Sequence, residues 1–407
     1  MSEQATPRAS RHYILAAGGT GGHMIPAFAL AAELIARGHT VALVTDTRGE
    51  AIPGMPKDMT AHVLPAGRMD GGILGKLKGL NAIRKGRAMA LRLIREMEPA
   101  AIVGFGGYPA MPTLLAARSA GVPYVIHEQN AVLGRVNRSL VGGAAAMATA
   151  YERIDRMPDK ARGKIHLVGN PVREEVLALR DQPFPPYLKE SILRVLVTGG
   201  SQGARILSRV VPEGFALLPE ELRHRLQVIQ QCRPEDIDAV REIYADNGIP
   251  AELGTYFEDM AQRLADAHLF VGRAGASTIA ELTAVGRPAI LVPLAIAMDD
   301  HQTANAREMA EAGGATSLPE PVFTPQALAD AVMAMVEEPD VLAAAAHHSW
   351  NCGRPDAARD LADLVEGLGG TPLMDIIRLD KKAPAKAASK PAAAAATSAK
   401  RELEKEA

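Results

Sequence analysis

Four apolar, strand-like segments of this chain each run into a glycine-rich turn, and a helical pattern starts after each turn. The turns are GGTGG at residues 18–22, GFGGYP at 104–109, GGSQGAR at 199–205 and GRAGAS at 272–277. Apolar strands that alternate with helices are typical of parallel sheets covered by helices on both faces. We therefore predict an α/β fold with two doubly wound parallel sheets and two of these turns in each half.

The predicted strands fall into two runs, separated near the turn-forming VGNPVR at residues 168–173. The first run contains the apolar segments at 12–17, 40–46, 100–107 and 123–130, and the second those at 193–198, 226–232, 268–272 and 288–293. This pattern predicts a domain over residues 1–168 and another over 169–354. The Ala/Lys/Pro tail at 371–407 has few apolar residues to bury, and we expect it to be disordered.

Composition narrows the classes of protein that the chain can belong to. A hydrophobic content of 47% over 407 residues is enough for two packed domains. The net charge of −2 gives no general attraction for nucleic acid, and we predict no nucleic-acid partner. Two distant cysteines favour a reducing compartment. The amino-terminal residues lack a signal-peptide core and no apolar run reaches ~18 residues, so we expect a cytoplasmic protein with at most peripheral membrane contact.

The glycine turns favour phosphate binding. Glycine allows close approach of a ligand, and the first N–H groups of the following helix attract an anion. In parallel sheets ligands bind at this edge. Met24 breaks the dinucleotide-binding spacing and no P-loop lysine follows the first turn. Asp46 ends the second predicted strand, where a dinucleotide fold holds a ribose, so a nicotinamide-dependent enzyme is one alternative.

Polar residues in the second half fit a nucleotide sugar. Glu281 lies one turn into the helix that begins near Ala276. Its carboxylate either accepts hydrogen bonds from two ribose hydroxyls or only complements the helix dipole. DDHQTANA at 299–306 places His301, Gln302 and Asn305 on one helix face, as sugar contacts or as a solvated surface. The DxD-like pair at 236–238 sits in a polar helical stretch, and we interpret it as a solvated face rather than a metal site.

Residues 68–95 form a stretch that is both basic and apolar. Between Arg68 and Arg95 there are eight basic residues and one acidic residue. Each cation near anionic lipid contributes up to ~1 kcal/mol, and inserted apolar side chains add to this. The alternative is an ordinary helix with a buried stripe and a basic solvated face. We predict a membrane-binding patch made of Ile73, Leu74, Lys76, Leu77, Lys78, Leu80, Arg84, Lys85 and Arg87.

Seven motifs in this order resemble the MurG family of glycosyltransferases over about residues 13–370. They are GGTGGHMIPA, GFGGYP, HEQNAVLGRVN, VGNPVR, GGSQGAR, GRAGASTIAEL and DDHQTANA. The resemblance implies the GT-B fold, in which two Rossmann-like domains face each other across a cleft and a final helix, here 355–370, crosses back to the first domain. It also implies an inverting transfer of GlcNAc from UDP-GlcNAc to the muramyl 4-hydroxyl of undecaprenyl-diphospho-MurNAc-pentapeptide, the step from lipid I to lipid II in peptidoglycan synthesis.

The same resemblance implies a place of action and partners. The lipid-linked acceptor stays in the bilayer, so the enzyme is expected at the cytoplasmic face of the inner membrane, on an anionic lipid surface. Wall-synthesis and division proteins are candidate partners. No cofactor is required by the fold, and a divalent cation that assists at the diphosphates is left open.

Site residues carry over from the motifs. The donor site is implied at Thr20, Gly21, Gly22, Asn130, Arg173, Ser201, Phe257, Ala276, Ser277, Thr278, Glu281, Gln302 and Asn305, and the acceptor site at Gly106, Tyr108 and Asn137. His23 is the preferred catalytic base because an imidazole with an unperturbed pKa of ~6.5 suits neutral pH. Glu128 is the alternative base, and His23 would then only orient its loop. The segment LAIAM at 294–298 lacks the His-Ala pair that family members often carry.

Two other functions are compatible with these motifs. One is a GT-B transferase that acts on a soluble acceptor, for which the basic patch has no purpose. The other is a catalytically idle nucleotide-sugar-binding scaffold for wall-synthesis partners.

Overall fold

Short, buried strands rich in alanine, valine and branched apolar residues form the first sheet. The computed structural model describes residues 10–65, 72–200, 203–294 and 298–370. The sheet is parallel, with the strand order β3-β2-β1-β4-β5-β6-β7. Its strands are β1 (His12–Ala16), β2 (Thr40–Thr45), β3 (Thr60–Val63), β4 (Ala101–Gly104), β5 (Tyr124–Glu128), β6 (Ala146–Thr149) and β7 (Ile165–Leu167).

The second sheet repeats this plan with the strand order β10-β9-β8-β11-β12-β13, again all parallel. Its strands are β8 (Leu193–Thr198), β9 (Leu226–Gln231), β10 (Ala251–Gly254), β11 (Leu269–Gly272), β12 (Ala289–Leu291) and β13 (Ala315–Ser317). The predicted α/β class with two doubly wound parallel sheets is confirmed.

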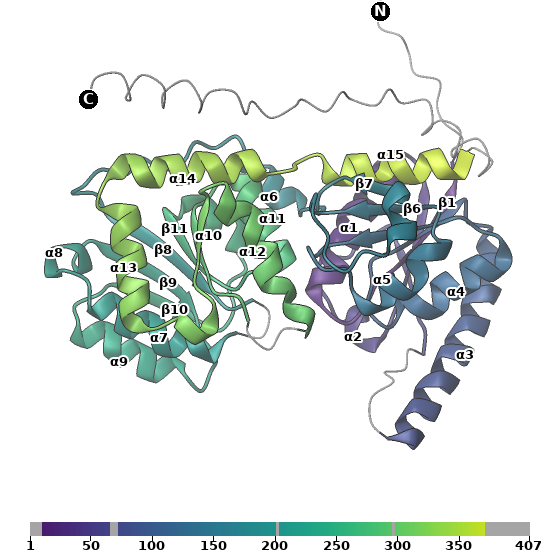
Figure 1. The fold of residues 1–407 in the computed structure, drawn as a ribbon, viewed down its shortest axis with the longest axis horizontal. Helices are drawn as coiled ribbons and strands as arrows, with labels where there is room; N and C mark the ends of the chain where they lie inside the picture. Colours follow the sequence, from purple (N-terminus) through teal and green to yellow (C-terminus); the bar gives the residue numbers. More distant parts are fainter. Residues whose placement is uncertain (1–9, 66–71, 201–202, 295–297, 371–407) are drawn as a thin grey trace, which may run out of the picture. The chain divides into compact units, whose positions relative to one another are not determined.

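Helices cover both faces of each sheet (Figure 1), and the central strands are accordingly buried on both sides. In the first half they are α1 (Gly21–Ala36), α2 (Thr47–Glu50), α3 (Ile73–Met97), α4 (Ala110–Ala120) and α5 (Arg135–Leu140), with the short 3-10 turns Val141–Gly143 and Asp159–Lys164. In the second half they are α6 (Glu174–Leu177), α7 (Arg205–Ala216), α8 (Glu220–Arg223), α9 (Ile237–Asp246), α10 (Met260–Asp266), α11 (Ala276–Val285), α12 (His301–Glu311), α13 (Pro325–Val336) and α14 (Pro339–Cys352), with the 3-10 turns Met298–Asp300 and Glu320–Val322.

The strand order brings the glycine turns together in pairs. In each sheet the winding reverses between two neighbouring strands, β1 and β4 in the first and β8 and β11 in the second. A parallel sheet opens a crevice at this switch point, beyond the carboxyl ends of the two strands. A Cβ on Gly18 would lie only 2.4 Å from Cγ of Pro109, so the first two turns are in direct contact. All four predicted glycine turns thus lie at the two switch points.

The final helix α15 (Ala357–Gly370) packs on α1 and β4 of the first half, although α14 before it packs on the second half (Figure 1). Its Glu366 accepts hydrogen bonds from Nε2 of His39 (2.7 Å) and Nη1 of Arg37 (2.9 Å). The predicted tail at 371–407 lies outside the described residues. Within the described ranges, no helix combines the length and apolar character needed to cross a bilayer.

Candidate active site

A cavity of about 400 Å³ opens at the switch point of the first sheet. Most of its walls come from the two glycine turns and from the segment after β5, and the second half adds Asp299 and His301. Seven residues predicted from the sequence line it, namely Thr20, His23, Gly106, Tyr108, Glu128, Asn130 and Asn137. The structure therefore gathers both base candidates and all three acceptor-site candidates in one place.

His23 lies in the first turn of α1, where its backbone N–H donates to Thr20 O over 3.1 Å. Nδ1 of its ring lies 2.9 Å from Oε1 of Gln129. A Cβ on Gly106, whose φ is +92°, would lie 3.4 Å from Cε1 of His23. Glycine at this position therefore serves both the left-handed backbone and the close approach of the imidazole.

Glu128 ends β5 and is almost completely buried. Its Oε1 accepts from the backbone N–H (3.1 Å) and Nδ2 (3.3 Å) of Asn130, and its Oε2 accepts from Gly134 N (2.9 Å) and Asn137 Nδ2 (2.8 Å). Four donors occupy the lone pairs that two carboxylate oxygens offer. The carboxylate thus holds the loop that follows β5, and Oδ1 of Asn137 has no hydrogen-bond partner among the described residues.

The donor candidates of the second half lie around the start of α11. Glu281 accepts from Nε of Arg173 over 2.9 Å, so two residues predicted to contact the donor contact each other. Burial raises the pKa of the Glu281 carboxyl, and the adjacent guanidinium opposes that rise. No side chain caps α11, whose first residues are Ala276, Ser277 and Thr278. Its first N–H groups therefore remain available to an anion.

Asn305 connects the two halves of the site. Its Oδ1 accepts from Ala131 N (2.8 Å), and its Nδ2 donates to Oδ1 of Asn130 (3.1 Å). Gln302, one turn earlier on α12, accepts from Leu294 N over 3.0 Å. Gln302 and Asn305 of the DDHQTANA segment are therefore hydrogen-bonded within the protein and do not lie on a simple solvated surface.

Phe257 is buried, and the guanidinium of Arg263 lies over its ring at 4.5 Å. The neighbouring Tyr256 is 69% exposed, so it is the aromatic ring that this segment presents to solvent. The guanidinium thus covers one face of the Phe257 ring. Asp46, the ribose candidate of the nicotinamide alternative, instead caps α2 through Gly49 N and pairs with Arg48 at 2.8 Å.

Some predicted residues lie apart from the cavity or outside the description. Gly21 and Gly22 begin α1 but do not line the cavity. Ser201 lies outside the described residues, as do residues 295–297 of the segment that lacks the histidine. Of the predicted membrane patch on α3, the side chains of Ile73, Leu74 and Lys76 are likewise outside the description.

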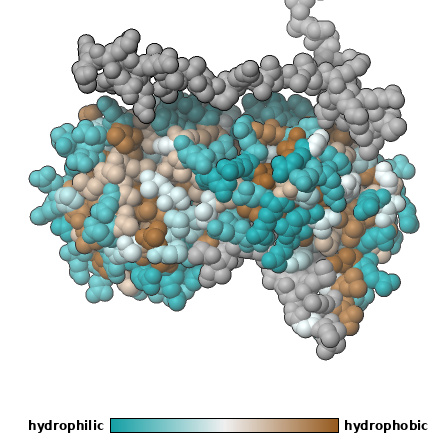
Figure 2. Space-filling model, viewed as in Figure 1, coloured by the Kyte–Doolittle hydropathy of each residue, from teal (hydrophilic) through white to brown (hydrophobic). Residues whose placement is uncertain are grey.

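The described part of that patch presents apolar and basic side chains side by side. Leu77 is 57% and Leu80 is 50% exposed, and Lys78, Arg84 and Lys85 are exposed as well. Figure 2 shows hydrophobic surface running along α3 next to hydrophilic surface. Arg87 instead donates to Oγ of Ser119 over 2.6 Å, and Ile83 is buried.

Sequence reasoning missed several charged residues of the cavity, namely Arg48, Arg135 and Asp299. Asp299 pairs with Arg156 and lies 3.8 Å from Nε of Arg135, across the two halves. Arg48 follows Asp46 by two residues, and its Nη2 would lie 3.0 Å from a Cβ on Gly19. Arg135 lies within the HEQNAVLGRVN motif and Asp299 begins DDHQTANA, but neither was assigned a role, and Arg48 lies in none of the motifs.

Family models match both halves of the chain. The glycosyltransferase family 28 N-terminal domain matches residues 13–149, and the glycosyltransferase family 28 C-terminal domain matches residues 194–364. Two relatives are named UDP-N-acetylglucosamine–N-acetylmuramyl-(pentapeptide) pyrophosphoryl-undecaprenol N-acetylglucosamine transferase. The one from Novosphingobium aromaticivorans is 66% identical over 91% of this chain and 96% of its own length. The one from Zymomonas mobilis is 58% identical over 89% of this chain and 93% of its own length.

Solved structures agree with the sequence relatives. MurG of Acinetobacter baumannii is 29% identical, with a TM-score of 0.69 over 88% of this chain and 99% of that one. UGT2 of Phytolacca americana shares the fold at 13% identity and a TM-score of 0.62, over 88% of this chain and all of that one. The predicted GT-B arrangement is confirmed. With relatives of this identity covering most of its length, the chain belongs to the MurG family, within glycosyltransferase family 28.

Proposed function

We propose that this chain transfers N-acetylglucosamine from UDP-N-acetylglucosamine to the muramyl 4-hydroxyl of undecaprenyl-diphospho-N-acetylmuramyl-pentapeptide, with inversion at the anomeric carbon. The names of the relatives support this activity. The structural observation that carries it is the pair of glycine-turn switch points, one with His23 at its cavity and the other with Glu281 and the start of α11. The first switch point can hold the diphosphate of the acceptor and supplies His23 as a base. The second is suited to a nucleotide.

In the proposed displacement the muramyl oxygen attacks C1 of the donor sugar while the bond from C1 to the diphosphate breaks. The electron pair of that bond goes to the β-phosphate of UDP, where the amino terminus of α11 stabilises the developing charge. The hydroxyl proton goes to a base, which we assign to Nε2 of His23, because Nδ1 is engaged with Gln129. Glu128 is a poorer acceptor for this proton, because four donors already occupy its oxygens.

The described residues contain no group of three or more His, Cys, Asp or Glu side chains placed to hold a metal ion. We assign any divalent cation that assists the transfer to the diphosphates of the substrates.

Transfer of labelled GlcNAc to a lipid-linked muramyl-pentapeptide, with a soluble muramyl acceptor in parallel, tests the proposal. We expect transfer to the lipid-linked acceptor and a fall in kcat of about 100-fold or more for His23→Ala. Exposed His347 provides the matched control, and His347→Ala should leave kcat unchanged. Transfer only to the soluble acceptor would favour the alternative transferase. Binding of UDP-GlcNAc without any transfer would favour the scaffold protein.

We also infer that the described part of α3 binds the anionic cytoplasmic face of the inner membrane. Exposed leucines flanked by exposed cations are the combination that an anionic bilayer surface attracts. Co-sedimentation with vesicles of anionic and of neutral lipids tests this. Leu77→Asp with Leu80→Asp should abolish binding to anionic vesicles while GlcNAc transfer in detergent persists. Equal binding by the variant would assign the membrane contact to another surface.

A further inference from the structure

A chain of hydrogen bonds runs from the cavity into the protein interior. Nδ1 of His23 lies 2.9 Å from Oε1 of Gln129. Nε2 of Gln129 lies 2.9 Å from Nδ1 of His127 and 3.0 Å from His127 O. Nε2 of His127 lies 2.9 Å from Gly169 O. His127 and Gln129 are almost completely buried, so water does not compete for these bonds.

Two backbone carbonyls fix the direction of every bond in this chain, because a carbonyl can only accept. Gly169 O requires that His127 carry its proton on Nε2, which leaves Nδ1 of His127 as an acceptor. His127 O requires the NH₂ end of the Gln129 side chain, whose other hydrogen meets Nδ1 of His127. The oxygen end of Gln129 then faces His23, which must donate from Nδ1.

We propose that Gln129 and His127 are positioning residues that hold His23 with its proton on Nδ1 and its lone pair on Nε2, the nitrogen left for the substrate. This inference rests on the proposed role of His23 as the base. A ring with the opposite tautomer would present an N–H to the muramyl hydroxyl and could not accept its proton. The titratable and charged groups that share the cavity with His23 are Arg48, Tyr108, Glu128, Arg135, Asp299 and His301.

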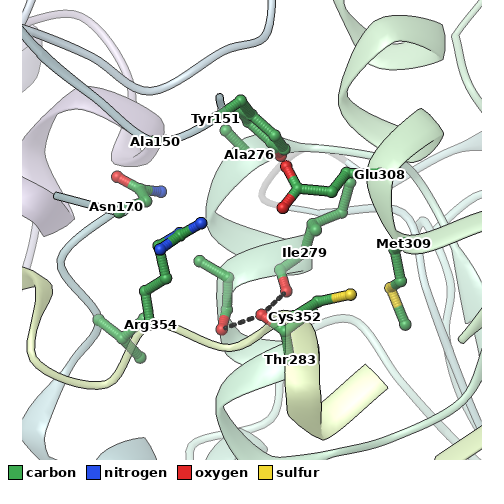
Figure 3. A pocket seen from close by; sticks show the side chains of 13 residues that line it. Ala150, Tyr151, Asn170, Ala276, Ile279, Thr283, Glu308, Met309, Cys352 and Arg354 are labelled. Atoms are coloured by element: carbon green, nitrogen blue, oxygen red, sulfur yellow. Dashed lines mark hydrogen bonds between the residues drawn. The ribbon is translucent and has the colours of Figure 1, made fainter. Parts of the chain in front are cut away.

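The anchor of this chain lies where the polypeptide crosses between the two halves. Gly169 has a φ of +93°. A Cβ at this position would lie 2.6 Å from Cβ of Arg354, which lies between α14 and α15, where the polypeptide returns to the first half. Its N–H donates to Thr149 O over 3.1 Å, which ties it to β6. Gly169 also borders a small cavity of about 40 Å³, at whose edge Asn170 and Arg354 lie (Figure 3). The carbonyl that sets the tautomers thus belongs to a residue that a backbone hydrogen bond ties to β6 and that the side chain of Arg354 packs against.

Burial supports the same arrangement, because it lowers the pKa of His127 to about 4. His127 is therefore neutral at working pH and keeps the acceptor nitrogen that Gln129 requires.

Substitutions at two positions separate a positioning role from a structural one. Gln129→Met keeps the length of the side chain but neither donates nor accepts, so His23 loses its partner. We expect kcat to fall at least tenfold while the KM for UDP-GlcNAc changes by less than about twofold, because a base in the wrong tautomer affects the chemical step. His127→Asn keeps an acceptor near the position of Nδ1 and should retain most of kcat, whereas His127→Leu should not. Exposed Gln262→Met is the matched control.

Nitrogen NMR of histidine-labelled full-length protein reads the tautomer without any turnover. We expect wild-type His23 to carry its proton on Nδ1 and Gln129→Met to give a mixture of tautomers. A wild-type proton on Nε2, or a tautomer and kcat unchanged by Gln129→Met in a protein that melts like wild type, would overturn the proposal. If the tautomer behaves as expected but no acceptor is glycosylated, the positioning chain stands and the proposed function fails.

Discussion

At the residue scale, Glu128 and His23 line one cavity, but their hydrogen bonds give them different capacities as bases. Replacing Glu128 by glutamine puts an NH₂ group against donors that need an acceptor. We expect Glu128→Gln to lower the free energy of unfolding by about 1–3 kcal/mol together with kcat. His23→Ala should lower kcat with less than about 1 kcal/mol of destabilisation. Urea unfolding and GlcNAc transfer on the same preparations measure both quantities.

The opposite pattern would reassign the base. If Glu128→Gln unfolds like the wild type but loses the dependence of kcat on pH, while His23→Ala keeps that dependence, Glu128 takes the proton. The loop after β5 would then be held by other contacts than the four that Glu128 makes.

Arg173 and Glu281 give a second prediction at this scale. Burial raises the pKa of the Glu281 carboxyl, and Arg173 is the cation that opposes this rise. Without the guanidinium, Glu281 keeps its proton to higher pH and loses one acceptor for a ribose hydroxyl. We expect Arg173→Met to raise the KM for UDP-GlcNAc about tenfold, with the increase becoming smaller as the pH rises and the carboxyl ionises.

The control for this effect is Glu175, an exposed residue that also pairs with Arg173, at 2.6 Å. Glu175→Gln should leave the KM within about twofold of wild type. A KM in Arg173→Met that rises equally at all pH values would mean that the guanidinium contacts the donor itself.

The motifs predicted the residues of this site well where the role of a residue is local, and poorly where it depends on a partner far away in the chain. HEQN and the glycine turns brought His23, Glu128 and Asn130 to one cavity, as expected. Asp299 was not predicted, because its role depends on Arg135 and Arg156, which lie more than 140 residues away in the chain. Long-range ion pairs leave no local pattern in a sequence.

At the scale of the element, the sequence predicted eight of the nine interior strands in the described part of the chain and missed all four edge strands. The eight predicted apolar segments coincide with β1, β2, β4, β5, β8, β9, β11 and β12. Four of the missed strands, β3, β7, β10 and β13, are at sheet edges and are partly exposed, so their apolar signal is weak. The fifth, β6, has the sequence AMAT, in which two alanines disfavour a strand and only Thr149 favours one. Its neighbours in the sheet determine its conformation.

The attachment of α15 gives a prediction for one element. Glu366 is buried between His39 and Arg37, so its removal leaves polar groups in the interior without their anion. We expect Glu366→Ala to lower the free energy of unfolding by about 3–5 kcal/mol. Asp363 pairs with the same Arg37 at 2.5 Å but is 61% exposed, and Asp363→Ala should cost less than about 1 kcal/mol. Equal losses in both variants would mean that burial does not decide the strength of this attachment.

At the scale of the whole molecule, polar contacts join the two halves. Arg307 lies 3.3 Å from Asp155, and Asn305 bonds to Ala131 and Asn130 across the junction. The sequence predicted that each half carries two glycine turns, but only the strand order explains why they meet in pairs at the switch points. Which side chains cross between the halves could not be predicted, because each half folds around its own core.

Each half buries a histidine whose neutral form the fold prefers, and this gives the whole molecule a predictable response to acid. Burial lowers the pKa of His127 in the first half to about 4, and burial together with Arg194 lowers that of His268 in the second half to about 4. In the unfolded chain both imidazoles take up protons near pH 6.5. Below that pH the unfolded state therefore binds more protons than the folded state, and stability decreases until the folded histidines also titrate near pH 4.

From pH 7 to pH 5, the extra proton binding by the unfolded state lowers the free energy of unfolding by about 2 kcal/mol for each histidine. Urea unfolding of wild type and of His268→Asn at the two pH values isolates the contribution of His268, because the carboxylates contribute equally to both proteins. We expect His268→Asn to lose about 2 kcal/mol less than wild type on acidification, and exposed His347→Asn to match wild type. If His268→Asn shows the same acid loss as wild type, His268 is protonated in the folded protein. The second half would then hold a buried imidazolium next to Arg194, which only an anion bound nearby would stabilise.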